Sequence, residues 1–518
     1  MDTVKLKKVL YDEIEDFRKI GHEFTSGEMK MMEFKHHSGG FGVYAHRAGK
    51  EFMIRLRIPS GKTDVKELKK IYDFTQKYNL PRIHFTTRQA IQLHGLNIDQ
   101  ICDLMKEALD VDIYTRGAGG NFPRNVALSP LAGVNPKEAF DPTPYALATG
   151  NYFLERIYTY HLPRKLKVSF SGSENDGAHC TVQDLGFLAI NKEGKRYFQV
   201  YLGGGLGQNP RLAVKYPELI EPEKVLYYVE AMVKFFMAEG DYENRSKARV
   251  RYILERMGED RFISEYRKYV EAELEKGGLD ICPEEINYDK PGKVTDIQSL
   301  RLYHQKQEGL YSVYLHPTGG QLSVEDLKNL IEILEEIPGA DIRLAMTEGL
   351  YIRNLDGDEA EKVLKVTEAM GNDTLVKQSV ACIGAPICQI GMGNSQKLLR
   401  DIIEYLEDRN YKKDLLPRVQ ISGCPNSCGI HQAGAIGFTG KKKKVGEELT
   451  DCFTLFVGGS FHSKHPSIGK SYGEIPAEKI PEFIYDLGKL LEEKDVVFTE
   501  YMDKYGEELE EFIKPYLV

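Results

Sequence analysis

The chain has 518 residues, a length that suggests three or four domain-sized units able to bury several hydrophobic cores. Its composition is ordinary for a globular protein, and its net charge of −9 argues against a general nucleic-acid binder, whose surface would be basic. No run of 18 apolar residues is present, so no membrane span is expected, and the N-terminal MDTVKLKKVLYDEIEDF predicts an amphipathic helix instead of a signal peptide. We therefore expect a cytoplasmic enzyme with neither a nucleic-acid nor a membrane partner.

A strand, helix, strand pattern occurs twice along the chain. Residues 52–61 alternate apolar and polar side chains up to a Pro/Gly turn, which predicts a strand. Residues 65–78 have apolar side chains three and four apart, which predicts a helix, and residues 83–96 (IHFTTRQAIQLHGL) predict a further strand. The same order recurs in residues 310–320, 324–337 and 342–355.

A second pair of segments repeats in the same order. Residues 162–190 parallel residues 416–440, and residues 197–207 parallel residues 452–461. Chance similarity between ordinary segments is the alternative, but four landmarks in a shared order favour an internal duplication. We therefore expect an α+β fold made of two copies with pseudo-twofold symmetry, built from mixed sheets with helices and joined near residues 277–298.

The first copy holds an unusual group of basic residues close to glycines and to predicted strand ends. Arg88 lies within an otherwise apolar predicted strand, and Lys165 and Lys167 fall on one face of another, because side chains alternate along a strand. Two ammonium groups on one face repel each other unless an anion lies between them. Each residue alone is most simply a surface charge, but the group indicates an anion site. Its other members are Arg116, Arg124 and Arg164.

The second copy holds four cysteines in two tight pairs, C-x5-C and C-x3-C. They lie in glycine-rich segments that are poor in bulky side chains, at positions Cys382, Cys388, Cys424 and Cys428. Four thiolates can ligate one zinc ion or an iron–sulfur cluster, and unligated thiols are a third possibility. The five-residue spacer is long for a zinc site, and the small neighbours allow the backbone to approach a cluster or a flat macrocycle. The spacing therefore favours iron–sulfur but leaves zinc open.

The segments ACIGAPICQIGMGNSQ and ISGCPNSCGIHQAGAIGFTG closely resemble the cysteine signature of the sulfite and nitrite reductase family, which also shares the duplication. The resemblance implies that the four cysteines hold a 4Fe–4S cluster. It also implies that Cys428 bridges to the iron of sirohaem, a macrocycle with eight carboxylates. The domains that it implies are an N-terminal helix with a ferredoxin-like half-domain (1–115), a first sulfite/nitrite reductase domain on the anion and sirohaem side (116–280), a linker with a second half-domain (281–375), and a second reductase domain with the cluster ligands and C-terminal helices (376–518).

The resemblance also implies roles for the basic group. The positions that match Arg88, Arg124, Lys165 and Lys167 surround the bound anion in this family, where protons must be supplied as oxygen leaves as water. Further contacts to the sirohaem are expected from Gln92, His94, Arg116, Asn121, Asn125 and Arg164.

The expected substrate depends on Lys167. Family members specialised for sulfite carry lysine at this position, whereas nitrite enzymes usually carry asparagine, and the additional charge suits a doubly charged anion. We therefore expect six-electron reduction of sulfite to sulfide. Reduction of nitrite to ammonia is the nearest alternative, and a non-catalytic, metal-stabilised binding protein is the remaining one. A Tyr–Cys crosslink known from some members is expected to be absent, because Tyr44 is available but residues 111–123 contain no cysteine.

The electron donor is expected to be a separate protein, most simply a ferredoxin. The glycines of residues 203–207 (GGGLG) follow a predicted strand but precede a loop, so they do not form a dinucleotide-binding motif. Residues 441–444 (KKKK) either attract an acidic donor towards the cluster or form a solvated hairpin turn. The C-terminal residues 492–518 predict an ordinary amphipathic helix.

Overall fold

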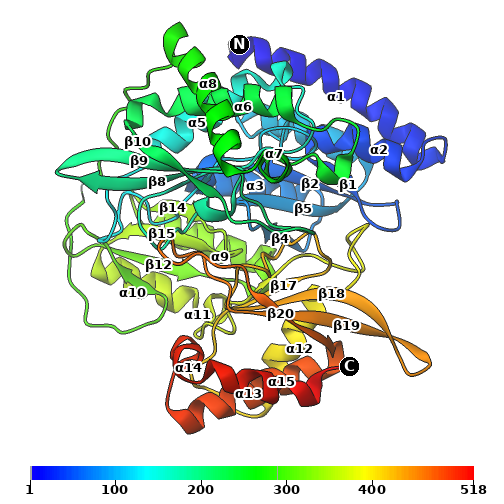
Figure 1. Cartoon of the computed structure of the whole chain (residues 1–518), viewed down its shortest axis with the longest axis vertical. Coiled ribbons are helices and arrows are strands. Elements are labelled where there is room, and N and C mark those ends of the chain that lie inside the picture. Colours follow the sequence, from blue (N-terminus) through cyan, green and yellow to red (C-terminus); the bar gives the residue numbers. More distant parts are fainter. Residues whose placement is uncertain (1–2, 289) are drawn as a thin grey trace.

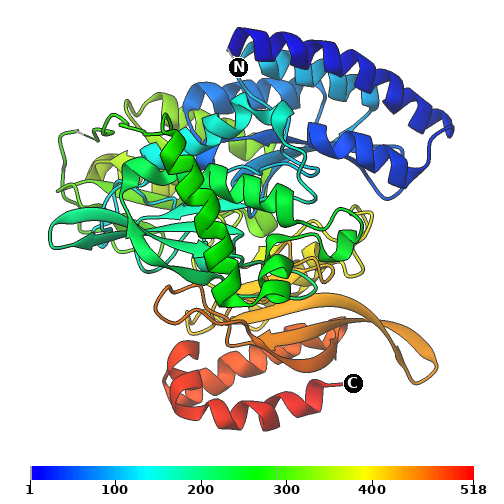
Figure 2. The same ribbon diagram turned by 45° about the horizontal axis from the view of Figure 1, so that its top comes forward.

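The computed structural model describes residues 3–288 and 290–518. Its strands form four sheets of five strands each (Figure 1). Helices α1 (Thr3–Ser26) and α2 (Met31–Ser38) lie at one end of the molecule, and α13 (Ile480–Lys494) lies at the opposite end, in both Figure 1 and Figure 2. The N-terminal amphipathic helix is therefore confirmed for the residues that the structure describes.

The first small sheet is antiparallel, with the strand order β1-β2-β5-β4-β13. Its strands are β1 (Val43–Ala45), β2 (Phe52–Arg57), β4 (Arg82–Phe85), β5 (Ala90–Leu96) and β13 (Gln321–Ser323), and its helices are α3 (Val65–Lys77) and α4 (Ile98–Asp110). Both helices begin at a side-chain cap: Asp64 accepts a hydrogen bond from the Glu67 amide, and Asn97 forms a capping box with Gln100.

The second small sheet repeats this arrangement, with the order β11-β12-β15-β14-β3. Its strands are β11 (Leu302–His304), β12 (Tyr311–Leu315), β14 (Asp341–Leu344), β15 (Leu350–Leu355) and β3 (Lys62–Thr63), and its helices are α9 (Val324–Glu335), α10 (Gly357–Val366) and α11 (Glu368–Gly371). The last strand of each sheet comes from the other copy: β3 pairs with β14, and β13 pairs with β4. Each sheet thus covers one edge with a strand of its partner, and the apolar residues of both half-domains join in one continuous core.

The two larger sheets also share one topology, β6-β7-β8-β9-β10 and β16-β17-β18-β19-β20, in which the first three strands are parallel and the others antiparallel. The strands are β6 (Ala127–Leu128), β7 (Val168–Ser171), β8 (Leu185–Lys192), β9 (Lys195–Leu202), β10 (Val214–Ile220), β16 (Val380–Ala381), β17 (Val419–Ser422), β18 (Ile436–Val445), β19 (Glu448–Val457) and β20 (Lys470–Pro476). The helices are α5 (Thr143–Glu155), α6 (Val225–Glu239), α7 (Val250–Met257), α8 (Glu259–Lys276), α12 (Ser395–Asp408), α13, α14 (Phe498–Tyr505) and α15 (Leu509–Ile513). The predicted duplication and the α+β class are confirmed.

The predicted C-terminal helix is wrong as a single element. α13 ends at Lys494, because Asp495 adopts a left-handed conformation with φ of 51°, and the two short helices α14 and α15 follow. Among the described helices, none has both the length and the apolar character needed to cross a lipid bilayer. The domain limits expected at residues 115, 280 and 375 stay predictions.

The four lysines at 441–444 lie within strand β18 and not in a hairpin turn. They pair with residues 449–452 of β19, and the turn falls at Gly446, where φ is 61°. Three of the ammonium groups meet carboxylates: Lys441 and Lys443 contact Glu474 at 2.7 and 3.0 Å, and Lys442 contacts Asp451 at 2.6 Å. Much of the positive charge of this segment is therefore compensated locally.

Candidate active site

The four paired cysteines lie in two neighbouring loops of the second copy. Cys382 and Cys388 follow β16, and Cys424 and Cys428 follow β17, the strand beside it. The amide of Cys382 donates to the carbonyl of Ile421 at 3.1 Å, which extends the pairing of the two strands into the loops. Burial raises the pKa of the Cys382 and Cys424 thiols, and a bound cation would favour their thiolate forms.

Glycines allow these two loops to approach closely. A Cβ on Gly384 would lie 2.3 Å from the Ser395 hydroxyl, and a Cβ on Gly429 would lie 2.0 Å from the carbonyl oxygen of Ile421. The amide of Gly423 donates to Cys382 Sγ at 3.1 Å, which is a contact that a thiolate ligand favours. The donor set and the bare backbone around it therefore fit the expected cluster.

The four thiols influence one another electrostatically. Cys428 is electrostatically coupled to Cys382 and Cys424, and Cys424 also to Cys388. Within residues 3–288 and 290–518, however, no three His, Cys, Asp or Glu side chains converge closely enough to hold a single metal ion.

The same two loops occur in the first copy, with other residues at the positions of the four cysteines. The amide of Ser129 donates to Phe170 at 2.9 Å, as Cys382 does to Ile421, which makes Ser129 the counterpart of Cys382. By the same register the counterparts of Cys388, Cys424 and Cys428 are Asn135, Ser173 and Gly177. Asn135 donates a hydrogen bond to the Ser173 hydroxyl at 3.2 Å, so two of these side chains bond directly to each other.

Lys165 and Lys167 lie in an extended segment just before β7. Leu166 between them forms a single bridge with Pro123, so the two lysines precede the strand and do not belong to it. Among the described residues, neither ammonium group has a hydrogen-bond or ion-pair partner. Both are electrostatically coupled to Cys428, which joins the basic group of the first copy to the cysteines of the second.

The environment of the two lysines disfavours their charge. Burial, assisted by Arg249 and Lys167, lowers the pKa of Lys165 well below its ordinary value. Burial, assisted by Arg88 and Arg249, lowers the pKa of Lys167 to about 7. An anion placed between the two ammonium groups would relieve this cost, and near neutral pH Lys167 is poised to release a proton.

Asp184 and Arg249 complete this site and were not singled out from the sequence. Asp184 is fully buried and forms a forked ion pair with Arg249, with N–O distances of 2.8, 2.9 and 3.1 Å. Its Oδ2, which also accepts from Arg249, accepts the backbone amide of Lys167 at 2.8 Å. The alternation of Arg249 and Arg251 in ARVRY resembles that of the two lysines in RKLK and is the only hint in the sequence.

Arg88 lies in the turn between β4 and β5, so its expected place within a strand is wrong. Gln89 adopts a φ of 53°, and the hydroxyl of Thr86 accepts the amides of Arg88 and Ala90, which closes the turn. The Arg88 guanidinium donates to Asn125 O at 3.0 Å, to Val168 O at 2.7 Å and to Gln183 Oε1 at 3.1 Å. Burial lowers the pKa of Arg88 to about 9.

Arg124 is held by the glycine-rich loop that precedes it. Its two terminal nitrogens donate to Ala118 O and Gly120 O, both at 2.8 Å, whereas its buried Nε has no protein partner. The Tyr44 hydroxyl accepts the amide of Gly120 at 3.2 Å. Tyr44 therefore lies beside residues 111–123, which contain no cysteine that could form the Tyr–Cys crosslink. Asn121 in the same loop also has a buried oxygen without a protein partner.

Gln92 and His94 belong to a buried polar chain on β5. The Gln92 amide accepts from Arg55 at 2.7 Å and donates to His84 at 3.0 Å and to His94 at 3.3 Å. His94 contacts His46 at 3.2 Å. Burial lowers the pKa of His84 to about 4 and that of His94 well below its ordinary value, so both rings are neutral at pH 7.

Three other residues expected to contact the sirohaem differ in whether their hydrogen-bond donors are already used within the protein. Arg116 is paired with Glu13 at 3.2 Å and enclosed by the rings of Phe41, Phe122 and Tyr158. The amide nitrogen of Asn125 donates to three backbone carbonyls, those of Ile58, Arg88 and Gln89. Arg164 is partly buried near other arginines, and burial lowers its pKa to about 10. Arg116 and Asn125 thus use their donors within the protein, whereas Arg164 has none of these contacts.

The loop of residues 203–207 ties the two copies together. The amide of Gly207 donates to Gln432 Oε1 at 3.0 Å, and Gln432 Nε2 donates back to Gly207 O at 2.7 Å. From the other side, the Thr87 hydroxyl donates to the Cys428 carbonyl at 2.8 Å. The Cys428 loop is therefore held between two parts of the first copy, so residues of both copies meet at this site.

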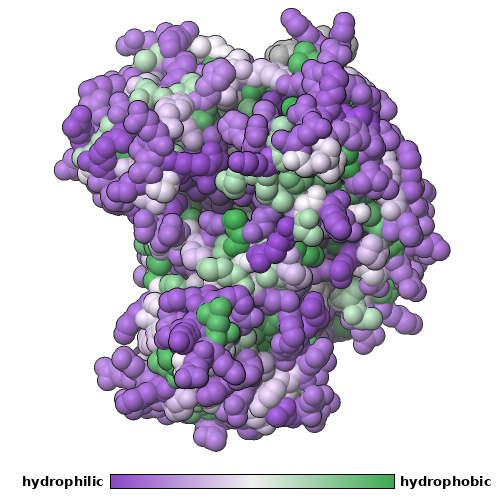
Figure 3. Space-filling view, turned by 90° about the vertical axis from the view of Figure 1, so that its right-hand side faces the viewer, coloured by the Kyte–Doolittle hydropathy of each residue, from purple (hydrophilic) through white to green (hydrophobic). Residues whose placement is uncertain are grey.

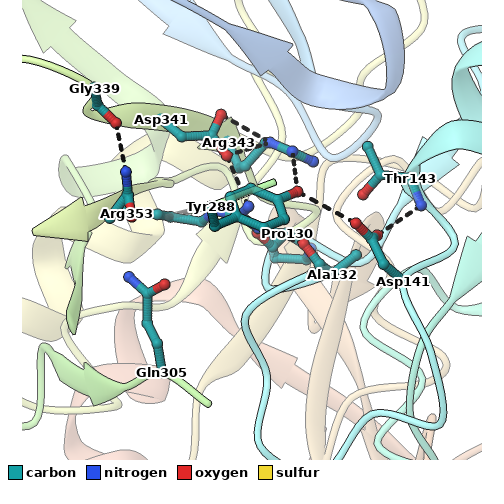
Figure 4. Close-up of polar contacts among 12 residues, drawn as sticks. Pro130, Ala132, Asp141, Thr143, Tyr288, Gln305, Gly339, Asp341, Arg343 and Arg353 are labelled. Atoms are coloured by element: carbon teal, nitrogen blue, oxygen red, sulfur yellow. Dashed lines mark hydrogen bonds and ion pairs between the residues drawn. The ribbon is translucent and has the colours of Figure 1, made fainter. Parts of the chain in front are cut away.

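The symmetry-related place in the second half-domain holds a different network (Figure 4). By strand register, Arg343 and Arg353 stand where the first copy has His84 and His94, and both guanidinium groups bond to Asp341. Tyr288, from the segment that joins the copies, reaches between them: its hydroxyl accepts from Arg343 at 3.2 Å and donates to Asp141 at 3.3 Å. Side chains of the protein therefore fill the part of the second half-domain that corresponds to the surroundings of His84 and His94 in the first.

Comparisons with known proteins agree with this geometry. Residues 119–274 and 373–493 match the family described as the nitrite and sulphite reductase 4Fe-4S domain, and residues 44–111 and 303–370 match the nitrite/sulfite reductase ferredoxin-like half domain. An assimilatory ferredoxin-dependent nitrite reductase from Haloferax mediterranei is 26% identical, over 92% of this chain and 85% of its own length. The haemoprotein β-component of a sulfite reductase (NADPH) from Anoxybacillus flavithermus is 27% identical, over 85% of this chain and 81% of its own.

A solved structure has the same fold. The NirA protein of Mycobacterium tuberculosis superimposes with a TM-score of 0.75 at 23% identity, and the match covers 93% of this chain and 91% of that one. The family matches span most of the chain and fall on both copies of the duplication. The chain is therefore an oxidoreductase of the nitrite and sulphite reductase family, with sirohaem and a 4Fe–4S cluster as its cofactors.

Proposed function

We propose that this protein reduces sulfite to sulfide, with electrons from a ferredoxin. The observation that supports this proposal most is the unpartnered pair of ammonium groups on Lys165 and Lys167 beside Cys428. Arg88, Arg124 and Arg249 surround the pair and are themselves held by carbonyl groups or by Asp184. A small, doubly charged oxyanion is the ligand that such a group attracts most strongly.

The cofactors are assigned to the residues that fit them. In this proposal Cys382, Cys388, Cys424 and Cys428 would hold the cluster, and Cys428 would also help to hold the sirohaem. The unpartnered nitrogen of Arg124 and the guanidinium of Arg164 would bind sirohaem carboxylates. Gln92 and His94, in the buried polar chain of β5, and Asn121, whose buried oxygen is an acceptor, would be further polar contacts. When bound, the coupled pair supplies the six electrons of the reduction at the anion.

The side chains of the protein supply position and protons. Arg88 and Arg124 have their guanidinium groups fixed by backbone carbonyls, so they present charge to an anion without further ordering. Lys167, with a pKa of about 7, can donate a proton as oxygen leaves and be reprotonated from solvent at neutral pH. Asp184 keeps this lysine from losing its proton entirely, because its negative charge raises the pKa of Lys167.

Nitrite is the second candidate substrate, because the curated relatives include ferredoxin-dependent nitrite reductases as well as sulfite reductases. Lys167 favours sulfite because it adds a positive charge that matters more for a doubly charged anion. Replacing it by asparagine removes this charge while keeping a hydrogen-bond donor.

The test compares both anions on Lys167→Asn with reduced methyl viologen as the electron source. We expect kcat/KM for sulfite to fall by about tenfold or more relative to that for nitrite, since one lost charge contact is worth about 1.4 kcal/mol. Lys192→Asn is the matched control, because Lys192 is an exposed lysine at the end of β8, which pairs with β7, the strand that Lys167 precedes. An unchanged ratio of the two kcat/KM values would refute the sulfite assignment.

The donor and the compartment belong to the same proposal. A ferredoxin donor is supported by the relatives whose names include ferredoxin. The role of residues 441–444 in attracting it stays a prediction, weakened by the carboxylates that three of these lysines contact. The cytoplasmic location also stays a prediction.

A further inference from the structure

His179 lies in the loop that returns from the end of β7 to the start of β8. The residue after it, Cys180, packs on β7: its Sγ accepts from the Ser169 hydroxyl at 3.5 Å and donates to the Ser169 carbonyl at 3.6 Å. Ser169 is only two residues from Lys167, and the loop ends at Asp184, which accepts the Lys167 amide at 2.8 Å. The backbone of His179 therefore runs alongside the segment that carries the anion-binding lysines.

Arg88 reaches the same loop from the first half-domain. Its guanidinium donates at 3.1 Å to Gln183 Oε1, four residues after His179, and at 2.7 Å to Val168 O, at the start of β7. The imidazole of His179 is electrostatically coupled to Arg88 and to Lys167. These are two of the four residues expected to surround the anion, so the ring of His179 lies close to the same site.

The second copy holds the imidazole ring in place. Phe461, in the loop between β19 and β20, stacks on His179 with the ring centroids 3.6 Å apart and an angle of 10° between the ring planes. This loop is fixed to the first copy, because the Ser463 amide donates to Glu174 O at 2.8 Å and Lys464 forms an ion pair with Glu174 at 2.7 Å. His179 is therefore fixed where the two copies meet.

The molecule is open to small solutes on one side. Figure 3 shows the right-hand side of Figure 1, where the surface is hollowed across its middle, between the part that carries α1 and the part that carries α13. The two parts belong to the first and the second copy. A solute as small as an oxyanion can therefore approach the region between the copies from this side.

The polar ring of His179 is particular to the first copy. Its backbone is left-handed, with φ of 59°, but so is that of Ile430, the residue at the corresponding place of the second copy, with φ of 62°. The conformation is thus shared by both copies, whereas the side chain differs. His179 is 6% exposed, and its buried Nδ1 has no hydrogen-bond partner among the residues that the structure describes. A buried nitrogen without a partner destabilises the folded protein unless a ligand binds to it.

The ring offers the site a kind of hydrogen bond that its cations cannot. Burial, assisted by the positive charges of Arg88 and Lys167, lowers the pKa of His179 to about 3, so the imidazole is neutral at pH 7. A neutral imidazole donates through one nitrogen and accepts through the other, whereas ammonium and guanidinium groups only donate. The oxygens of Asp184 and Gln183 already accept from arginines. His179 therefore brings an unused acceptor to the anion site.

We propose that His179 binds the substrate anion as a neutral hydrogen-bonding group and favours sulfite over nitrite. The inference rests on the proposed function, and it adds a specificity-determining residue to that site. Near neutral pH, sulfite coexists with hydrogensulfite, whose O–H form needs an acceptor, whereas nitrite carries no proton. A site lined only by cations would leave this O–H without a partner, and the imidazole accepts its hydrogen bond.

The test separates the hydrogen bond from the stacked ring. His179→Phe keeps a ring to stack on Phe461 but removes both nitrogens, whereas His179→Asn keeps polar atoms near the position of Nδ1 and suits a left-handed backbone. The Kd values for sulfite and nitrite are measured on the holoenzyme from the change in sirohaem absorption, and kcat/KM is measured with reduced methyl viologen. For His179→Phe the Kd for sulfite should rise by about tenfold and that for nitrite by less than about threefold, while His179→Asn should bind sulfite within about threefold of the wild type.

His304→Phe is the matched control, because His304 is an exposed histidine whose ring contacts Tyr311 in the second half-domain. Both Kd values should be unchanged in this control. If His179→Phe does not fold, His179→Ile gives the same comparison, because the second copy has isoleucine at this backbone conformation. Unchanged sulfite binding in the apolar variant, or an equal loss for both anions, would overturn the proposal. A wild-type enzyme that reduced neither anion would refute the proposed function, yet the two Kd values would still decide the role of His179.

Discussion

Replacing Asp184 by asparagine tests the electrostatic design of the site. Asp184 is fully buried, pairs with Arg249 through three contacts of 2.8 to 3.1 Å, and accepts the amide of Lys167 at 2.8 Å. Removing one partner of a buried ion pair costs about 3–5 kcal/mol, because the other charge is left uncompensated. The asparagine oxygen keeps part of the hydrogen bonding, so we expect the free energy of unfolding to fall by an amount near the lower figure, about 3 kcal/mol.

The loss is measured as a change in thermal unfolding. For a folding unit of 150–250 residues, about 1 kcal/mol shifts the melting temperature by about 2–4 °C, so Asp184→Asn should melt about 6–12 °C below the wild type. Asp358→Asn is the control, since Asp358 and Lys293 form an ion pair that is 67% and 59% exposed. Water screens this exposed pair, so Asp358→Asn should melt close to the wild type.

The same variant has a second, independent signature in its pH profile. Asp184 raises the pKa of Lys167 and of Arg88, so its loss should lower the pKa of Lys167 below about 7. A proton donor is active while protonated, so the alkaline side of the rate profile should move to lower pH. A variant that melts within 2 °C of the wild type, with an unchanged profile, would show that this carboxylate does not organise the site.

Three further predictions concern charge and stability. Lys167→Met should stabilise the apoprotein by about 1–3 kcal/mol at pH 7 while lowering activity. Because the pKa of Lys167 in the folded protein is lowered to about 7, the stability of the wild type should rise with pH above 7, and denaturant titrations at several pH values should show that the variant lacks this rise. Asp341→Asn removes the carboxylate shared by the two buried arginines of Figure 4 and should lower the free energy of unfolding by about 3–5 kcal/mol, measured by thermal unfolding, whereas the exposed control Asp358→Asn should melt close to the wild type. Burial raises the pKa of Glu67 to about 7, so the folded protein keeps the Glu67 carboxyl protonated where the unfolded chain loses that proton, and stability falls as pH rises towards 7. Glu67→Gln keeps an acceptor for the Thr63 hydroxyl and should therefore melt above the wild type at pH 8 and close to it at pH 4.

The sequence was most informative where the pattern is local. Strand and helix periodicity repeats within a few residues, so the two copies could be aligned and the α+β class predicted. The spacing of Cys382, Cys388, Cys424 and Cys428 is likewise a property of two short segments. Its resemblance to the family signature predicted the cofactors, and the family comparisons agree.

Partners that lie far apart in the chain were decided only by the tertiary structure. Nothing in the periodicity of β3 or β13 shows that each strand completes the sheet of the other copy, because pairing depends on which edge is exposed after the sheets form. Asp184 and Arg249 are separated by 65 residues, and each alone resembles a surface charge until burial forces them together. The lysines at 441–444 looked like free positive charge, but three of them meet carboxylates of neighbouring strands. Local spacing thus determines which chemistry the chain can carry, and burial with long-range pairing decides which charges remain free to perform it.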